Sequence, residues 1–234
     1  MDKPRTTAKS VETRERILRA AARLFAELGF HETTLRRIAE EAEVALGLTY
    51  RYFPQKEDLA LALYTELATE LAARSTQPRA ATLGEGFVRA MGEKLRLARP
   101  QKESLAALFA ASLGQGGPAS IVGDRAEAVR TQVRSVFAGV VARATDLPAG
   151  LTDDERADVA TLLYGLHLVV LLVWLVERPG GRSTKALVEA AGSAIARATS
   201  LLPTPVARPV LRQAARWLDG FLGEREHSTT RRSS

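Results

Sequence analysis

The stretch TTLRRIAEEAEVALGLTYRYFP, from Thr33 to Pro54, predicts two short helices joined by a tight turn. Thr33 or Thr34 can supply the N-cap hydroxyl of the first helix. The inward positions of that helix are Leu35, Ile38, Ala39 and Ala42, at helical spacing. The second helix, Ala45–Phe53, ends before Pro54 because a residue that precedes proline is pushed out of the α region.

The second helix of this stretch carries an outward face. A helix turns about 100° per residue, so its side chains divide between two sides. Gly47, Leu48, Arg51 and Tyr52 share one side, Thr49 and Phe53 share the other, and Tyr50 lies between them. Because Arg51 cannot be buried unpaired without a large desolvation cost, the first of these sides is expected to face outward.

The outward side chains suit the groove of a nucleic acid. A tyrosine hydroxyl donates to a phosphate oxygen, an arginine fork matches the O6 and N7 acceptors of guanine, and Gly47 lets the backbone approach a groove wall. Lys56, at the positive N-terminus of the next helix, and the helix start at Thr33 or Thr34 add anion-binding points. The residues indicate a DNA-recognition helix; an aromatic patch on a solvated helix is the alternative.

The order of these elements resembles the tetracycline-repressor (TetR) family of bacterial transcriptional regulators. The resemblance spans about Thr13 to Leu63 and rests on TRERILRAAARLFAELGF, TTLRRIAEEA and GLTYRYFPQKEDL. It implies a helix-turn-helix near Leu35 to Pro54. The implied phosphate contacts are Thr33, Thr34, Arg36, Tyr50, Tyr52 and Lys56, and the implied base contacts are Leu46, Gly47, Leu48 and Arg51.

Two further groups of basic residues each have two possible interpretations. On the supporting helix, Arg36 or Arg37 would touch phosphate, although a solvated charge explains either residue equally well. At the N-terminus, Lys3, Arg5 and Lys9 form a basic arm that would enter an adjacent minor groove or would simply be disordered.

Three residues depart from the family pattern. Glu43 stands where the turn usually has glycine, so a positive φ is expected there at a cost of roughly 1 kcal/mol. Ala45 replaces the usual serine or threonine N-cap of the recognition helix, which forfeits about 1 kcal/mol. Leu48 precedes Thr49 where threonine then leucine is common, so an apolar contact, such as a thymine methyl group, replaces a groove-facing hydroxyl.

The rest of the chain predicts an all-α fold. Of its 234 residues 46% are hydrophobic and 6% aromatic, and alanine and leucine recur throughout, which favours helices over sheets. The other expected helices are Glu12–Leu28, Gln55–Arg74, Glu85–Arg99, Lys102–Leu113, Ser120–Thr145, Asp153–Glu177, Thr184–Leu201 and Pro209–Leu222. Helix breakers after Arg74 predict a domain boundary there, and the polar end of the chain predicts a flexible tail over 224–234. The resemblance implies that residues 1–74 bind DNA and that residues 75–223 bind an effector and form the dimer.

The segment Val159–Val176 carries no Asp, Glu, Lys or Arg and approaches the length of a membrane span. Against a span, it contains Thr161 and His167 and follows an ordinary capped helix start, DDERAD. A helix buried within a domain and against a partner subunit explains the run better. The expected homodimer contacts are Leu163, Leu166, Val170, Leu171, Trp174, Leu187, Ala191, Ala194 and Ala198.

The resemblance also implies an unknown small-molecule effector bound by the second domain. Its expected pocket residues are Phe87, Met91, Phe109, Phe137, Tyr164 and His167. For each aromatic residue ordinary core packing is the alternative, and for His167 it is a satisfied core or interface histidine.

Other functional classes find little support in the residues. No catalytic residue, metal site or cofactor is expected, because the three histidines make no metal-ligand spacing and there is no Gly-x-Ser-x-Gly elbow. Cysteine is absent and the N-terminus lacks the apolar core of a secretion signal, so a cytoplasmic protein is expected. The net charge of +6 is compatible with DNA or with an acidic membrane.

The sequence therefore predicts a dimeric, sequence-specific regulator, expected to be a repressor that an effector releases from double-stranded operator DNA. One alternative is a helical module that binds acidic membranes or a partner protein through its basic surface. A cofactor-free enzyme in the helical domain is the other alternative, and it would turn over a bound ligand.

Overall fold

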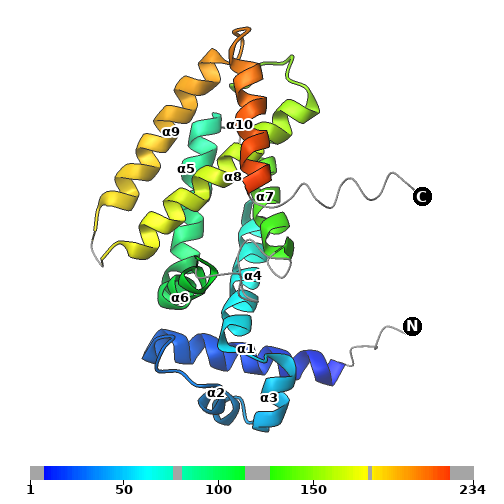
Figure 1. Cartoon of the computed structure of the whole chain (residues 1–234), viewed down its shortest axis with the longest axis vertical. Coiled ribbons are helices and arrows are strands. Elements are labelled where there is room, and N and C mark those ends of the chain that lie inside the picture. The colour runs from blue at the N-terminus through cyan, green and yellow to red at the C-terminus, as the bar shows by residue number, and fades with distance from the viewer. Residues whose placement is uncertain (1–7, 76–80, 114–126, 179–180, 222–234) are drawn as a thin grey trace, which may run out of the picture. The chain divides into compact units, whose positions relative to one another are not determined.

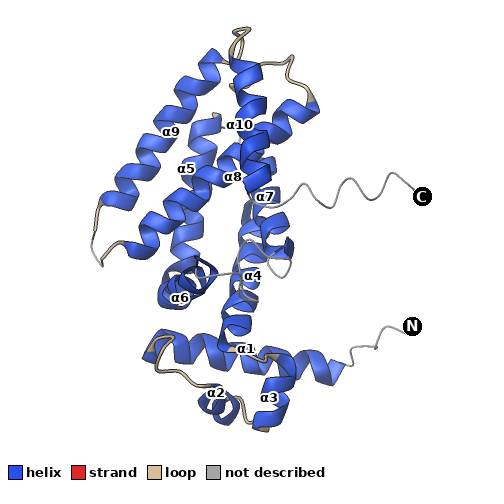
Figure 2. Ribbon diagram, in the orientation of Figure 1, coloured by secondary structure: helices blue, strands red, loops and turns tan. Residues whose placement is uncertain are grey.

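The computed structural model describes residues 8–75, 81–113, 127–178 and 181–221, where its regular structure is helical (Figure 2). In chain order the elements are α1 (Ala8–Leu28), α2 (Leu35–Glu41), α3 (Leu46–Tyr52), α4 (Lys56–Ser75), α5 (Leu83–Ala98), the 3₁₀ turn η1 (Arg99–Gln101), α6 (Lys102–Leu113), α7 (Glu127–Ala142), α8 (Asp153–Val176), α9 (Ser183–Leu201) and α10 (Ala207–Phe221) (Figure 1). In those ranges extended backbone pairs only at an isolated bridge between Ala81 and Ala144. The predicted all-α class is confirmed.

Most predicted helix boundaries lie within a few residues of the observed ones. The largest difference within the described residues is at α1, which begins at Ala8 rather than Glu12. Some expected features lie outside the described residues: Lys3 and Arg5 of the basic arm, the first residues of the helix expected from Ser120, and the tail over 224–234.

The chain divides into two compact units that differ from the predicted boundary after residue 74. The first unit contains residues 1–66 and 99–121, and the second contains residues 67–98 and 122–234. Residues 99–113 join the first unit because η1 and α6 pack against α1. The division after Glu66 falls within the helix α4. The helix breakers that follow Arg74 gave no sign of a boundary inside this helix.

The core of the first unit is built on one side of α1. Ile17, Leu18, Ala21 and Phe25 are buried there, as their helical spacing predicts. Gly29 ends the helix with a φ of 81°, a left-handed conformation that glycine adopts without steric cost. The chain then turns so that the Phe30 ring lies 5.1 Å from that of Phe25.

The second unit is a bundle in which α8 is central, since it contacts α5, α7, α9 and α10. Two glycines set the approach of α5 to α9: a Cβ added at Gly84 would collide with the backbone carbonyl of Gly192. On another side, Gly165 of α8 receives the side chain of Leu218 from α10. Glycines therefore allow close packing both of α5 against α9 and of α8 against α10.

The apolar helix α8 begins as the sequence predicts. Thr152 and Glu155 form a capping box, with Thr152 accepting from the Glu155 amide at 3.2 Å and Glu155 accepting from the Thr152 amide at 3.0 Å. By length and composition α8 could cross a membrane, and 39% of its most apolar window is buried within the protein. Its buried side, which includes Val159, Leu163 and Val170, forms part of the core of the second unit.

Candidate functional site

The helix α3 is anchored by one side and exposed on the other. Thr49 and Phe53 are buried, as predicted. Leu46, Gly47, Tyr50 and Arg51 are exposed, with 38% of Leu46 and 50% of Tyr50 accessible; we call these four residues the α3 face. Leu48 and Tyr52, which the sequence placed on the outward side, are half-buried at its edge. The predicted face is therefore rotated by part of a turn, toward Tyr50.

The helix α1 holds α3 in this orientation. The hydroxyl groups of Ser10 and Tyr52 share a hydrogen bond of 2.8 Å. Four residues farther along α1, the guanidinium carbon of Arg14 lies 5.3 Å from the centre of the Phe53 ring. Sequence reasoning did not identify Ser10 or Arg14, because the contact that gives each its role joins residues about 40 positions apart. These contacts from α1 orient the α3 face.

Gly47 leaves a space on the α3 face. A Cβ added at Gly47 would meet no atom within 4 Å, so the protein itself has no steric need for glycine there. Tyr50 and Arg51, about one helical turn farther along, have long exposed side chains. The arrangement allows a groove wall to approach the helix backbone.

The turn before α3 has the backbone that the sequence predicts. Glu43 has a φ of 52°, and the N-cap Ala45 makes no side-chain hydrogen bond to the helix. Both departures from the family pattern are therefore present in the fold.

Replacing Glu43 by glycine should stabilise the first unit. We expect Glu43→Gly to raise the free energy of unfolding by about 1 kcal/mol, because glycine adopts this conformation without the steric cost that Glu43 incurs. Urea denaturation measures the change. Glu40→Gly, in the regular helix α2, is the control and should lower stability by a similar amount. A loss of stability in Glu43→Gly would show that the Glu43 side chain is needed at the turn.

Lys56 lies at the start of α4 with two of its three N–H donors in use. Its ammonium donates to the carbonyl oxygens of Phe30 at 2.8 Å and His31 at 3.2 Å, and lies 4.6 Å from the centre of the Phe30 ring. Lys56 therefore fixes the loop before α2 and keeps one donor for an outside anion.

The two threonines at the start of α2 have different roles. Thr33 is fully buried, and its hydroxyl donates to the carbonyl oxygens of Leu24 and Gly29, at 3.2 and 2.8 Å. The prediction that Thr33 contacts phosphate is therefore wrong, because an enclosed hydroxyl cannot reach DNA. Thr34 is the N-cap: it is exposed, and its oxygen accepts from the Arg37 amide at 3.2 Å. Arg36 is exposed and ion-paired with Glu40 at 3.1 Å, a weak pair that a phosphate can replace.

In the second unit, a lysine and a histidine meet in the interior. The Nζ atom of Lys94, on α5, lies 2.6 Å from Nε2 of His167, on α8, and both side chains are fully buried. The other ring nitrogen of His167 lies 3.2 Å from the Tyr164 carbonyl oxygen, which can only accept. His167 Nδ1 therefore carries the proton, Nε2 accepts, and Lys94 donates. We call these two residues the Lys94–His167 pair.

Burial governs the ionisation of the pair. It lowers the pKa of Lys94 from 10.5 to about 7. Burial, and after it the charge of Lys94, lower the pKa of His167 well below its ordinary 6.5, against an opposing effect of the hydrogen bond to Tyr164. The interior therefore favours the neutral imidazole of His167, and Lys94 loses its proton at a lower pH than an exposed lysine does.

Stability should consequently depend on pH through Lys94. Between about pH 7 and 10.5 the folded chain has released the Lys94 proton that the unfolded chain still binds, so the free energy of unfolding rises with pH. Below about pH 7 both states are protonated and the destabilisation is fully present. Urea denaturation at pH 7, 8 and 9 should show this rise, and Lys94→Met should reduce it. Lys185→Met, at an 83% exposed side chain, is the control. Equal slopes in all three proteins would contradict the assignment.

The predicted effector residues do not all come together. Phe87, Met91, Phe137, Tyr164 and His167 are buried in the second unit, where the Phe137 and His167 rings lie 5.4 Å apart. Phe109 belongs to the first unit, where its ring lies 6.4 Å from that of Tyr64. Lys94 was missed, although it follows Phe87 and Met91 at helical spacing and that position was a usable signal.

The predicted dimer contacts fall partly in the core. Leu163, Val170, Leu171 and Ala191 are buried within their own unit, so the prediction that they contact a partner is wrong for this conformation. Ala194 and Ala198 are exposed, and the half-buried members are Leu166, Trp174 and Leu187.

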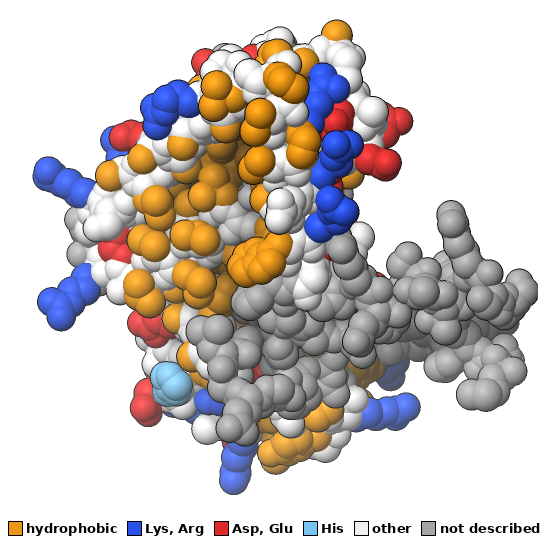
Figure 3. Space-filling model, turned by 45° about the horizontal axis from the view of Figure 1, so that its top comes forward, with side chains coloured by type: hydrophobic (Ala, Val, Ile, Leu, Met, Phe, Trp, Pro, Cys, Tyr) orange, Lys and Arg blue, Asp and Glu red, His pale blue; other side chains and the backbone are white. Residues whose placement is uncertain are grey.

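A different set of apolar side chains is exposed on the second unit. It contains Val169, Leu172 and Val176 on α8, with Val210 and Trp217 on α10, and we call it the apolar face. Val169 is 51% accessible, Val176 81% and Trp217 71%. Figure 3 shows apolar side chains gathered on the side of this unit formed by α8, α9 and α10. Exposure of this extent indicates a surface for another macromolecule.

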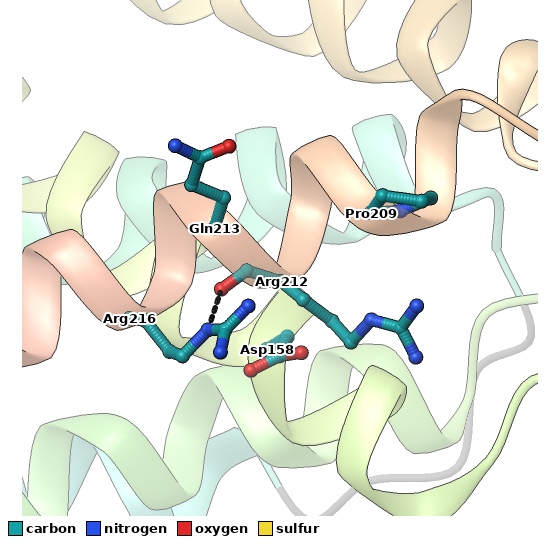
Figure 4. A pocket seen from close by; sticks show the side chains of 5 residues that line it. All are labelled: Asp158, Pro209, Arg212, Gln213 and Arg216. Atoms are coloured by element: carbon teal, nitrogen blue, oxygen red, sulfur yellow. Dashed lines mark hydrogen bonds between the residues drawn. The ribbon is translucent and has the colours of Figure 1, made fainter.

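A groove of mixed charge lies between α8 and α10. Its volume is about 520 Å³. Figure 4 shows Asp158 of α8 beneath Arg212 and Arg216 of α10. The Nε atom of Arg216 donates to the Arg212 carbonyl oxygen at 3.3 Å. Burial raises the pKa of Asp158, the charge of Asp219 adds to the rise, and the two arginines oppose it. Among the described residues no group of three or more histidines and acidic side chains is arranged to hold a metal ion.

Comparison with known proteins shows which family the DNA-binding region of the first unit resembles. Residues 17–63 match the family described as bacterial regulatory proteins, tetR family. This region of the chain is of the TetR type. The match lies within the first unit and supports a DNA-binding regulator rather than an enzyme.

Similar TetR-family regulators match over the DNA-binding region. The regulator HbdR of Aromatoleum sp. (strain CIB) is 48% identical over 48 residues, which is 20% of this chain and 21% of HbdR. The fatty acid metabolism regulator protein of Bacillus subtilis (strain 168) is 42% identical over 50 residues, 21% of this chain and 26% of that protein. The matches thus span about a quarter of these relatives.

Solved structures share the fold of the chain more widely. FadR of Thermus thermophilus, a TetR-family repressor solved with lauroyl-CoA, aligns over 78% of this chain and 92% of its own with a TM-score of 0.61 and 24% identity. A TetR-family regulator from Streptomyces coelicolor aligns over 87% and 88%, with a TM-score of 0.59 and 21% identity. The TetR-like architecture therefore extends beyond the matched N-terminal residues.

Proposed function

We propose that the protein is a cytoplasmic, homodimeric repressor that binds a specific operator and leaves it when a small molecule binds. The observation that carries this proposal is the α3 face: a glycine, a tyrosine and an arginine exposed side by side on a helix whose other side is buried. A helix of this kind fits the major groove, where each base pair presents a distinct pattern of donors and acceptors.

The exposed residues divide between reading and positioning. Arg51 reads a guanine, and Leu46 and Gly47 approach base edges, with Leu48 at the margin of the contact. Phosphates are bound by Tyr50 and Tyr52 of α3, by Thr34 and Arg36 of α2, and by Lys56. Thr33 supports them from inside by holding the loop that leads into α2.

The apolar face supports a homodimer. Its residues Val169, Leu172 and Val176 recur along one side of α8, and burying them against a second copy removes apolar surface from water. Exposed Ala194 and Ala198 on α9 let a partner helix approach closely. Two recognition helices related by a two-fold axis would read half-sites roughly 34–36 Å apart, or a multiple of that spacing.

Release by an effector is an equilibrium between two states of the dimer. An effector weakens operator binding only by binding the DNA-incompetent state more tightly than the competent one. The aromatic interior of the second unit, around Phe87, Phe137 and Tyr164, is the proposed effector region. The lauroyl-CoA bound to FadR of Thermus thermophilus supports a ligand role for this fold.

Selection from a random duplex library at near-physiological salt tests the proposal. A dimeric specific repressor should enrich an inverted repeat, and the enriched duplex should bind at least a thousandfold more tightly than random DNA. Equal binding of all duplexes by folded, dimeric protein would contradict it and would favour a basic interaction module.

A further inference from the structure

The Lys94–His167 pair places two basic groups inside an aromatic region of the second unit. The rings of Phe137 and Tyr164 lie 5.4 and 5.5 Å from that of His167, and the Phe87 ring stacks on Phe137 at 5.9 Å. All of these side chains are buried. The surroundings of the pair are therefore suited to a ligand with a mostly apolar body.

The two facing nitrogens can serve one acidic group. Lys94 Nζ donates to His167 Nε2 across 2.6 Å, while His167 Nδ1 donates to the Tyr164 carbonyl oxygen. If His167 takes up a proton, Nε2 becomes a donor as well, and the two nitrogens can bind the two oxygens of one carboxylate. Charge-assisted hydrogen bonds of this kind are roughly twice as strong as neutral ones.

We propose that the Lys94–His167 pair anchors an organic monocarboxylate, whose two oxygens insert between Lys94 Nζ and His167 Nε2. The apolar body of the ligand packs against Phe87 and Phe137, and the adaptable side chain of Met91 makes room for it. Both nitrogens are enclosed, so the surrounding side chains part when the ligand enters. The identification of this ligand as the effector rests on the proposed function, whereas the binding site itself does not.

The cost of the pair to the fold supports a role in binding. Burial lowers the pKa of Lys94, so the interior by itself disfavours the positive charge that a carboxylate would favour. A methionine of similar length would fill this position without that cost. A merely structural Lys94 and a ligand-binding Lys94 therefore make opposite predictions for Lys94→Met: unchanged ligand binding in one case, and loss of binding in the other.

Calorimetric titration of the full-length protein with decanoate, phenylacetate and the neutral 1-decanol tests the site. We expect at least one carboxylate to bind, 1-decanol to bind at least tenfold more weakly than decanoate if decanoate is the ligand, and Lys94→Met to weaken carboxylate binding by about 10- to 100-fold. Lys185→Met, which removes an exposed lysine, should bind as the wild type does. Repeating the titration in two buffers of different ionisation enthalpy should reveal proton uptake, because His167 and the neutral fraction of Lys94 become charged.

Several results would overturn the proposal: no binding by either carboxylate, equal binding by Lys94→Met, or carboxylate binding with no proton uptake. If Lys94→Met does not fold, Lys94→Gln replaces it, and proton uptake by the wild type decides independently. The titrations use free protein, so they do not depend on operator binding. Lys94-dependent carboxylate binding that leaves operator binding unchanged would support the site and contradict the effector role in the proposed function.

Discussion

Arg51→Ala should lower affinity for the selected operator by about 10- to 100-fold and relax the base preference at one position of each half-site. Arg51 is exposed on the α3 face, and a good bidentate contact between arginine and guanine is worth about 1–3 kcal/mol of discrimination. A phosphate contact would act differently, because its loss weakens all sequences alike. Fluorescence anisotropy with the selected duplex and its single-base variants measures both quantities.

Two variants separate reading of a base from simple loss of charge. Tyr50→Phe removes a hydroxyl from the same face and should weaken specific and altered duplexes by the same factor. Arg89→Ala removes an equal charge from an exposed position of α5 in the second unit, and it should leave base preference unchanged. If Arg51→Ala kept wild-type affinity and preference, the assignment of the α3 face as the reading surface would be wrong.

Val169→Asp should convert the proposed dimer to a monomer and reduce operator affinity by more than about 100-fold. Val169 lies in the apolar face, and burying an unpaired carboxylate in such an interface is strongly unfavourable. A monomer also loses the gain from binding two linked half-sites, which reaches about 10²–10⁴. Sedimentation velocity gives the association state, and anisotropy with the whole operator gives the affinity.

The matched control for this change is Ala138→Asp, at an exposed position of α7 outside the apolar face. It adds the same charge and should leave the protein dimeric with unchanged operator affinity. Dimeric Val169→Asp would show that the subunits associate through another surface. Monomeric Val169→Asp with full operator affinity would contradict a requirement for two linked half-sites.

The DNA-binding region could be predicted closely because its signals are local. The Thr34 cap and apolar spacing determine where α2 begins, and Pro54 stops α3, whose own N-cap Ala45 makes no side-chain hydrogen bond. The choice between Thr33 and Thr34 could not be made in advance, since adjacent hydroxyls compete for the N-cap and only the folded loop shows that Thr33 points inward. The orientation of α3 also depends on Ser10 and Arg14, which contact it from α1.

The second unit was harder to predict because α8 is apolar on every side. With no polar side to orient it, periodicity cannot separate the core positions Val170 and Leu171 from the exposed Val169 and Leu172. The packing of α7 and α10 against α8 determines which of its residues are buried. The burial of Lys94 likewise follows from the position of His167, far away in sequence, although its place on the apolar side of α5 was visible.

The most direct test of the central claim is methylation interference on the selected operator, in which guanine N7 is methylated in the major groove before binding. We expect methylation of one guanine in each half-site to block the wild-type protein and to have no effect on the residual binding of Arg51→Ala, because N7 is one of the two guanine acceptors that the proposed Arg51 contact uses. Wild-type binding that no guanine methylation weakens, or equal interference in Arg51→Ala, would contradict base reading by the α3 face.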